Sequence, residues 1–149
     1  MSAPGRRSLM DVLVLIGRIL FAVLFLGAAL NHLTHTKQMA GYAGSRGVPA
    51  TVATPLTLAT GLLLLTGALS VLLGIWADLG ALLLAVFLLP TAFVMHAFWT
   101  EEGDARMEEM LHFMKDLALS GAALMLLAFF SYTGDELGLT LTGPLFGIS

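Results

Sequence analysis

Apolar residues gather along the chain in four long stretches separated by polar residues. The stretches run from about Leu9 to Leu33, Pro55 to Ile75, Leu79 to Phe98 and Leu111 to Phe130. Each comes close to the roughly 20 apolar residues with which a helix crosses a hydrocarbon layer about 30 Å thick. None alternates in polarity over the shorter lengths typical of barrel strands. The pattern predicts an all-α fold, an integral membrane four-helix bundle.

The connections between the stretches determine how the predicted helices run. Only Trp76–Asp78 separates the second and third helices, so they must be antiparallel neighbours. The connections at about 32–54 and 99–110 are longer. Up-down-up-down passage through four spans then places both longer loops on the same membrane face and the termini on the other. We expect 1–149 to be a single transmembrane domain whose tail, 131–149, packs at the interface or is disordered.

Composition supports lipid as the main solvent of this chain. Of its 149 residues, 58% are hydrophobic and 11% are charged, whereas soluble domains are about 45–50% apolar and about 25% charged. The mean hydropathy is +0.91. The net charge of −3, with no basic run, argues against nucleic acid as a partner. The chain has no cysteine, so any redox chemistry requires a bound cofactor, a metal on His or carboxylate ligands, or a partner protein.

Basic residues near the spans bear on orientation, because they favour the cytoplasmic side. Arg6 and Arg7 precede the first span. The opposite side carries Lys37, Arg46 and Arg106, so the two sides are nearly balanced. We predict that both termini are cytoplasmic.

Ionisable residues within the spans are costly in lipid and therefore mark interior or functional positions. In the first helix, Asp11, Arg18, Phe25 and His32 recur every seven residues and share one face. Arg18 lies well inside the span, either in a structural interhelical pair or in a site for an anion or cofactor headgroup. The second helix has instead a ridge of small residues that favours close helix packing, formed by Thr66, Gly67, Ser70 and Gly74.

The predicted topology gathers all four histidines at the end that carries the long loops. His32 and His35 close the first helix, His96 closes the third, and His112 opens the fourth. Imidazoles with carboxylates could bind a metal, and two facing histidines could hold a haem. Tight metal-ligand spacing is missing, however. We expect a polar pocket without metal, and keep a metal or haem site on these four histidines as an alternative.

Several segments together resemble one known family. They are Gly17-Arg18 followed by Gly27 and Asn31-His32, Tyr42 followed by Gly47-Val48-Pro49, His96-Ala97-Phe98-Trp99, and Phe113-Met114-Lys115-Asp116-Leu117-Ala118. In this order, over nearly the whole chain, they are similar to the DoxX family of small bacterial membrane proteins. The resemblance implies a four-helix protein of the bacterial inner membrane with a loose link to redox metabolism. Some relatives are subunits of a thiosulfate:quinone oxidoreductase, and others are linked to oxidative stress or thiol homeostasis.

The resemblance also suggests site residues, with two departures. The positions carried over are Arg18, Asn31, His32, Tyr42, Pro49, His96, Trp99 and Lys115. Relatives often have a glutamate in the second helix, but nothing acidic occurs here between Ser45 and Asp78. Relatives usually have asparagine where this chain has Asp116. Loss of a buried carboxylate weakens a proposal of proton-coupled quinone chemistry. Asp116, which we expect near the interface, could replace that carboxylate.

The sequence therefore predicts a membrane subunit or accessory protein of a quinone-linked or oxidative-stress redox system, an oxidoreductase subunit if it is part of an enzyme. Tyr42, Phe98 and Trp99 would form flat walls around a quinone, the one cofactor that we consider. The candidate ligand-binding residues are Arg18, Asn31, His32, Tyr42, His96, Trp99, Lys115 and Asp116. The alternatives are a non-enzymatic scaffold, assembly factor or small-molecule carrier, and a His-based metal or haem protein. The expected partners are the lipid bilayer, redox proteins and a second copy of the chain.

Overall fold

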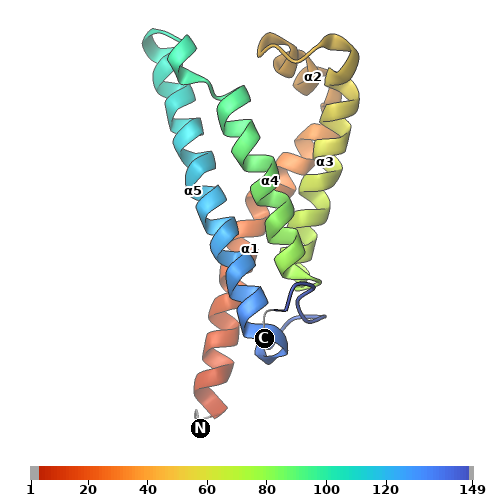
Figure 1. Ribbon diagram of the computed structural model, residues 1–149, viewed down its shortest axis with the longest axis vertical. Coiled ribbons are helices and arrows are strands. Elements are labelled where there is room, and N and C mark those ends of the chain that lie inside the picture. The colour runs from red at the N-terminus through yellow and green to blue at the C-terminus, as the bar shows by residue number, and fades with distance from the viewer. Residues whose placement is uncertain (1–3, 148–149) are drawn as a thin grey trace.

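The computed structural model describes residues 4–147, and every regular element in that range is helical. The elements are α1 (Pro4–Thr34), α2 (Thr36–Ser45), α3 (Ala50–Leu73), α4 (Ala77–Met95), the 3-10 turn η1 (Phe98–Thr100), α5 (Gly103–Thr133) and the 3-10 turn η2 (Gly134–Glu136) (Figure 1). Four of them, α1, α3, α4 and α5, are long and apolar enough to cross a membrane. The all-α prediction with four spans is confirmed.

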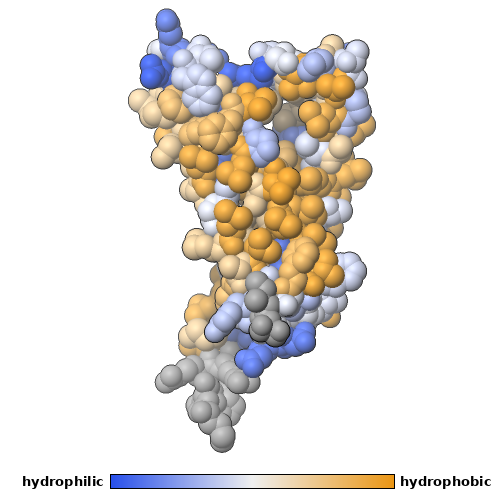
Figure 2. Space-filling model, in the orientation of Figure 1, coloured by the Kyte–Doolittle hydropathy of each residue, from blue (hydrophilic) through white to orange (hydrophobic). Residues whose placement is uncertain are grey.

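Most of the apolar surface of these helices faces outward. Only 22% to 33% of the apolar window in each span is buried inside the protein. Figure 2 shows the result on the visible face as a hydrophobic band across the middle of the molecule, with hydrophilic side chains at the end that carries the longer connections. Water cannot solvate so large a band cheaply, so lipid must cover it.

The closest backbone contacts between the four long helices join α1 with α3, α3 with α4, and α4 with α5. Side chains also join α1 to α4, where the rings of His32 and Phe87 lie edge to face with their centroids 6.1 Å apart. A core of small and aliphatic side chains fills the shared interfaces, formed by Ala22, Phe25, Ala29, Leu64, Ala68, Val71, Ala81, Leu84 and Leu88.

Small residues bring α3 and α4 close together, as the ridge in the second predicted helix suggested. A Cβ atom on Gly80 would lie 2.3 Å from Ser70 Oγ, and one on Gly67 would lie 3.0 Å from the Leu84 side chain. Close packing is thus confirmed for Gly67 and Ser70. Thr66 instead faces outward and donates its hydroxyl hydrogen to the Leu62 carbonyl, 2.9 Å away.

The two longer connections lie at one end of the molecule, here called the loop end. The α3–α4 turn and both termini lie towards the other end, the turn end (Figure 1). This arrangement confirms the up-down-up-down topology. Towards the loop end, α4 and α5 diverge from α1, α2 and α3 (Figure 1).

Several helix boundaries differ from the predicted ones. Helix α4 ends at Met95, before the predicted Phe98, because His96 leaves the helix with φ −115° and ψ 45°. Helix α3 begins at Ala50, so that Pro55 lies inside the helix and does not start it. Helix α2 lies in the connection that was expected to be a loop.

The tail after η2, over residues 137–147, packs against the turn end. The Asp78 carboxylate accepts hydrogen bonds from the backbone N–H groups of Leu145 and Phe146, at 2.9 and 2.6 Å. The Asp11 carboxylate accepts one from Gly138 N–H at 3.1 Å. Asp78 is fully buried and needs such donors, so its carboxylate, together with that of Asp11, holds the tail over the turn end.

Candidate functional site

Charged and polar side chains from α2, α4 and α5 meet at the loop end. This loop-end cluster consists of Tyr42, Arg46, His96, Glu109, His112, Lys115 and Asp116. Local structure explains the convergence. His96 caps the C-terminus of α4, while Glu109, His112 and Asp116 are spaced by three and four residues and therefore share one face of α5.

His96 lies between two carboxylates. Its Nδ1 atom is 2.8 Å from Glu109 Oε2, and its Nε2 atom is 3.7 Å from Asp116 Oδ2. The His112 ring stacks on the His96 ring, with centroids 5.1 Å apart and planes 24° apart. All three side chains of the carboxylate–imidazole–carboxylate series are largely shielded, at 13%, 16% and 7% exposure from Glu109 to Asp116. An imidazole in this position can accept a proton on one nitrogen and release one from the other.

The other oxygen of Glu109 receives donors from α2 and the residue after it. The Arg46 guanidinium donates to Glu109 Oε1 and also to Glu101 Oε1, the latter at 2.7 Å. The Tyr42 hydroxyl is 3.3 Å from both Glu109 Oε1 and the Met95 carbonyl, either of which can accept its hydrogen. Burial, followed by the charge of Glu109, raises the pKa of the Tyr42 phenol. The phenol therefore stays protonated, and a donor, at neutral pH.

Asp116 is the deepest member of the cluster. It is 5% exposed and is therefore buried by the surrounding helices. Ser120, one turn further along α5, is buried as well and donates to the Asp116 backbone carbonyl at 2.7 Å. Lys115 lies on the outside of α5 with its Nζ atom 3.1 Å from His112 Nδ1. The polar face of α5 thus continues from the loop end into the buried interior at Asp116 and Ser120.

An aromatic group lies beside the cluster, on α4, η1 and α5. Phe93, Phe98 and Trp99 surround the Phe113 ring at centroid distances of 5.3, 5.4 and 5.8 Å, mostly edge to face. Trp99 and Phe93 are about half exposed. Phe98 and Trp99 therefore lie together as predicted, whereas Tyr42, the third predicted wall, belongs to the charged network.

Four of the eight predicted ligand-binding residues lie outside the loop-end cluster: Trp99 lies beside it, and Arg18, Asn31 and His32 lie away from it. Arg18 is near the turn end, where it donates to the carbonyls of Val71 and Leu72 at the end of α3 and to that of Leu139 in the tail. The Asn31 amide contacts the Met39 sulfur at 3.3 Å. The His32 ring bonds to the Ala28 carbonyl of its own helix. The structure thus brings together Tyr42, His96, Lys115 and Asp116, with Trp99 next to them.

The four histidines share the loop end but form two separate groups. The His32 ring donates to the Ala28 carbonyl at 2.9 Å, and the His35 ring is 2.9 Å from Thr34 Oγ1. His96 and His112 stack face to face and do not point at a common centre. Within the residues that the structure describes, no group of three or more His, Asp or Glu side chains is arranged to hold a metal ion.

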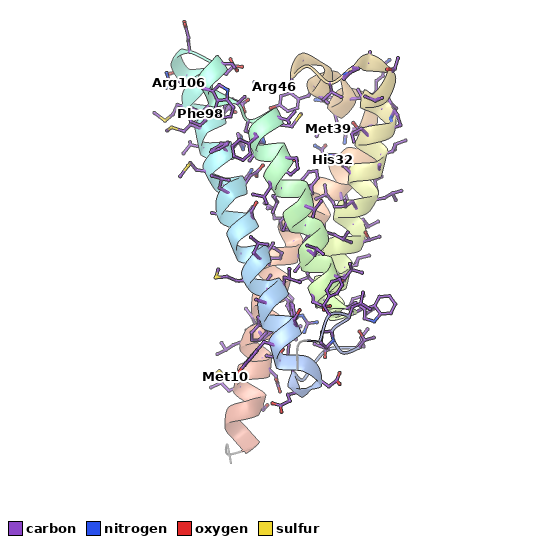
Figure 3. All side chains as sticks on the ribbon, in the orientation of Figure 1. Met10, His32, Met39, Arg46, Phe98 and Arg106 are labelled. Carbon is purple, nitrogen blue, oxygen red and sulfur yellow. The ribbon has the colours of Figure 1, made fainter. Side chains whose placement is uncertain are left out.

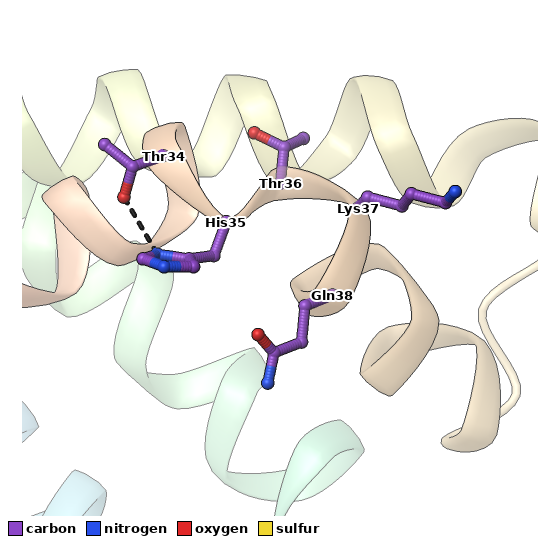
Figure 4. Close-up of a pocket in the computed structure, with 5 residues that line it drawn as sticks. All are labelled: Thr34, His35, Thr36, Lys37 and Gln38. Carbon is purple, nitrogen blue, oxygen red and sulfur yellow. Dashed lines mark hydrogen bonds between the residues drawn. The ribbon is translucent and has the colours of Figure 1, made fainter.

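A shallow cavity of about 390 Å³ lies at the junction of α1 and α2, lined by Thr34, His35, Thr36, Lys37 and Gln38 (Figure 4). Figure 4 shows His35 and Gln38 extending to the same side of the chain, with Lys37 directed away from them. Most of these side chains are exposed. The cavity belongs to the loop end, but it does not include His96 or Asp116.

Glu109 and Arg46 are central to the cluster, although the sequence did not single them out. Glu109 is one of several acids in the 99–110 connection, and Arg46 entered only as a charge that bears on orientation. Figure 3 shows Arg46 at the α2 side of the loop end, facing the ends of α4 and α5. Extending the polar stripe of α5 back from His112 by three residues would have found Glu109.

Comparisons with known proteins agree with this architecture. A model of the DoxX family matches residues 13–97. The inner membrane protein YqjF of Escherichia coli (strain K12) is 36% identical over 120 residues, which cover 80% of this chain and 85% of that protein. No solved structure matches. With its four candidate spans, the protein is a multi-pass protein of the inner membrane, and α5, which carries Glu109 and Asp116, lies beyond the matched family segment.

Proposed function

Because this chain belongs to the DoxX family, we propose that it is a membrane subunit or accessory protein of a redox system that binds a quinone headgroup at the loop end. The observation that carries the proposal is the series Glu109–His96–Asp116, in which an imidazole links a carboxylate at the loop end to one buried in the bundle. Such a series suits a reaction that takes up protons inside a membrane.

Quinone chemistry fits both the charged and the apolar parts of the site. A quinone becomes a quinol by gaining two electrons from a redox partner and two protons. Asp116 and His96 would hand protons to the headgroup oxygens, and Glu109 would replace them from the loop end. The aromatic group around Phe113 offers flat apolar surface beside these donors, the combination expected of a cofactor site. Asp116 also provides the acid that the second long helix lacks.

The carrier alternative fits the turn end less well. A carrier must open towards both sides of the membrane, but the tail covers the turn end and is bonded there to Asp11, Arg18 and Asp78. A site that opens at the loop end alone suits a ligand-binding redox subunit better. A scaffold without a ligand would be indicated if the following binding experiment gave no signal.

Tryptophan fluorescence provides the test, because the two tryptophans, Trp76 and Trp99, lie at opposite ends of the molecule. A short-chain quinone is titrated into Trp76→Phe protein, which reports from Trp99, and into Trp99→Phe protein, which reports from Trp76. We expect saturable quenching of Trp99 alone. Asp116→Leu removes the carboxyl group that would donate to the headgroup and should weaken binding about fivefold, the effect of losing one hydrogen bond of about 1 kcal/mol. Asp104→Leu, at an exposed acid of the loop end, is the matched control. Equal, unsaturable quenching of both tryptophans would refute the proposal.

A further inference from the structure

The loop end is divided into two halves. The closest backbone contacts of α1 and α2 are with α3 and with each other, while those of α5 are with α4 and η1. The halves spread apart towards the loop end (Figure 1), and Figure 2 shows a notch between them in the molecular surface. Helix-to-helix packing therefore does not close the loop end over His96 and Asp116.

Two side chains make the polar contacts across this gap. Tyr42 bonds to the Met95 carbonyl and to Glu109, and Arg46 bonds to Glu101 and Glu109. Within the described residues, no other hydrogen bond or ion pair links α2 or Arg46 to α4, η1 or α5. The Arg46 guanidinium also covers the Tyr42 ring, 5.4 Å from its centroid. The polar contacts that close the loop end are thus made by these two neighbouring side chains.

The segment that carries these side chains is bounded by two points at which the helical conformation is interrupted. Helix α2 has ten residues and is separated from α1 at His35, where φ is −116° and ψ is 36°. On its other side Gly47 has φ +91°, a conformation that favours glycine, and the space around it is open. Short elements between such points are the ones that move in hinge transitions.

We propose that Tyr42 and Arg46 form a latch that controls ligand access to the His96–Asp116 site. Glu109 connects the latch to the proton-carrying residues, because one of its carboxylate oxygens binds Arg46 and the other binds His96. Opening the latch removes the cation from Glu109 and leaves that carboxylate to His96 alone. Ligand entry and the proton-accepting state of the site are thereby coupled. The ligand, a quinone headgroup, is taken from the proposed function, on which this inference rests.

Cysteine labelling can test the latch because the chain has no cysteine of its own. Ser120→Cys places one thiol at a position that is 2% exposed, one turn below Asp116. Its rate of reaction with a water-soluble methanethiosulfonate then reports how often the loop end opens. Adding Arg46→Gln should raise this rate about tenfold, the effect on an opening equilibrium of losing roughly 1.4 kcal/mol from a partly buried charge-assisted bond. Arg106→Gln removes an exposed cation from the same end and should leave the rate unchanged.

Tyr42→Phe keeps the guanidinium and removes one donor, so it guards against a folding defect caused by Arg46→Gln. We expect a smaller acceleration, with the thermal unfolding midpoint in detergent close to that of the parent. Equal labelling rates in the parent, Arg46→Gln and Tyr42→Phe proteins would overturn the latch. Labelling does not require a quinone, so faster labelling without quinone binding would support the latch and refute the proposed function. Quinone binding with unchanged labelling would support the proposed function and refute the latch.

Discussion

Replacing Arg18 with methionine should destabilise the protein without affecting the loop-end site. Arg18 is 1% exposed and uses all three of its guanidinium nitrogens on backbone carbonyls, at 2.8 Å to Val71, 2.7 Å to Leu139 and 2.6 Å to Leu72. The carbonyls at a helix C-terminus lack partners within the helix and carry partial negative charge. Arg18 thus closes the end of α3 and ties it to the tail.

The expected loss follows from what methionine leaves behind. The substitution fills similar space and removes the buried charge together with its desolvation cost. It leaves the carbonyls of Val71 and Leu72 without their donor, at about 1–3 kcal/mol for each buried unsatisfied group. The Leu139 carbonyl lies in the tail, which can move. We therefore expect the free energy of unfolding to fall by about 3 kcal/mol.

Unfolding in mixed micelles with increasing SDS, followed by circular dichroism, measures this loss. Arg106→Met is the control, because Arg106 is an exposed arginine at the loop end, and it should change stability by less than about 0.5 kcal/mol. The folded Arg18→Met protein should keep its quinone affinity. A stability within about 0.5 kcal/mol of the parent would refute this account of Arg18. A selective loss of quinone binding would return Arg18 to the headgroup site that the sequence suggested.

Three further outcomes are expected. Gly80→Ala should cost about 1–3 kcal/mol of unfolding free energy, since its Cβ would collide with Ser70, whereas Gly121→Ala, with open space around it, should be neutral or slightly stabilising; SDS unfolding of both measures the difference. Asp78→Ala should release the tail and accelerate its proteolysis at least about tenfold, and an unchanged rate would show that the carboxylate does not hold it. Green fluorescent protein fused after Ser149 should fluoresce and alkaline phosphatase fused there should be inactive, whereas the opposite pair of results would place the C-terminus outside the cytoplasm.

The spans and their order could be predicted because lipid imposes a simple requirement. A helix that crosses a hydrocarbon layer must be long and apolar, and the three-residue connection at Trp76–Asp78 leaves no freedom in how its neighbours run. Helix α2 escaped prediction because it is short and mixes Gly, Ala and polar residues without an apolar run. The first turns of α5, from Gly103, were missed because their charges mask a helix that continues past the apolar segment.

The sequence could predict those parts of the site whose positions follow from the order and direction of the long helices. His96 and Asp116 were brought to one end by topology alone, and the structure places them 3.7 Å apart. Arg18 makes a structural contact between helices, one of the two roles that the sequence left open, but its partners are backbone carbonyls of α3, which the sequence does not specify. The pairing of Arg46 with Glu109 depends on the position of α2 over the loop end, which no local pattern specifies.

Photo-crosslinking with an azidoquinone, followed by peptide mapping in inner-membrane vesicles, tests the central claim most directly. The account predicts labels at the loop end of α4 and α5, around His96, Trp99 and Asp116, that excess unmodified quinone displaces. Labels spread along the lipid-facing helices, or concentrated at the turn end beside Arg18, would contradict a quinone site formed by the Glu109–His96–Asp116 series.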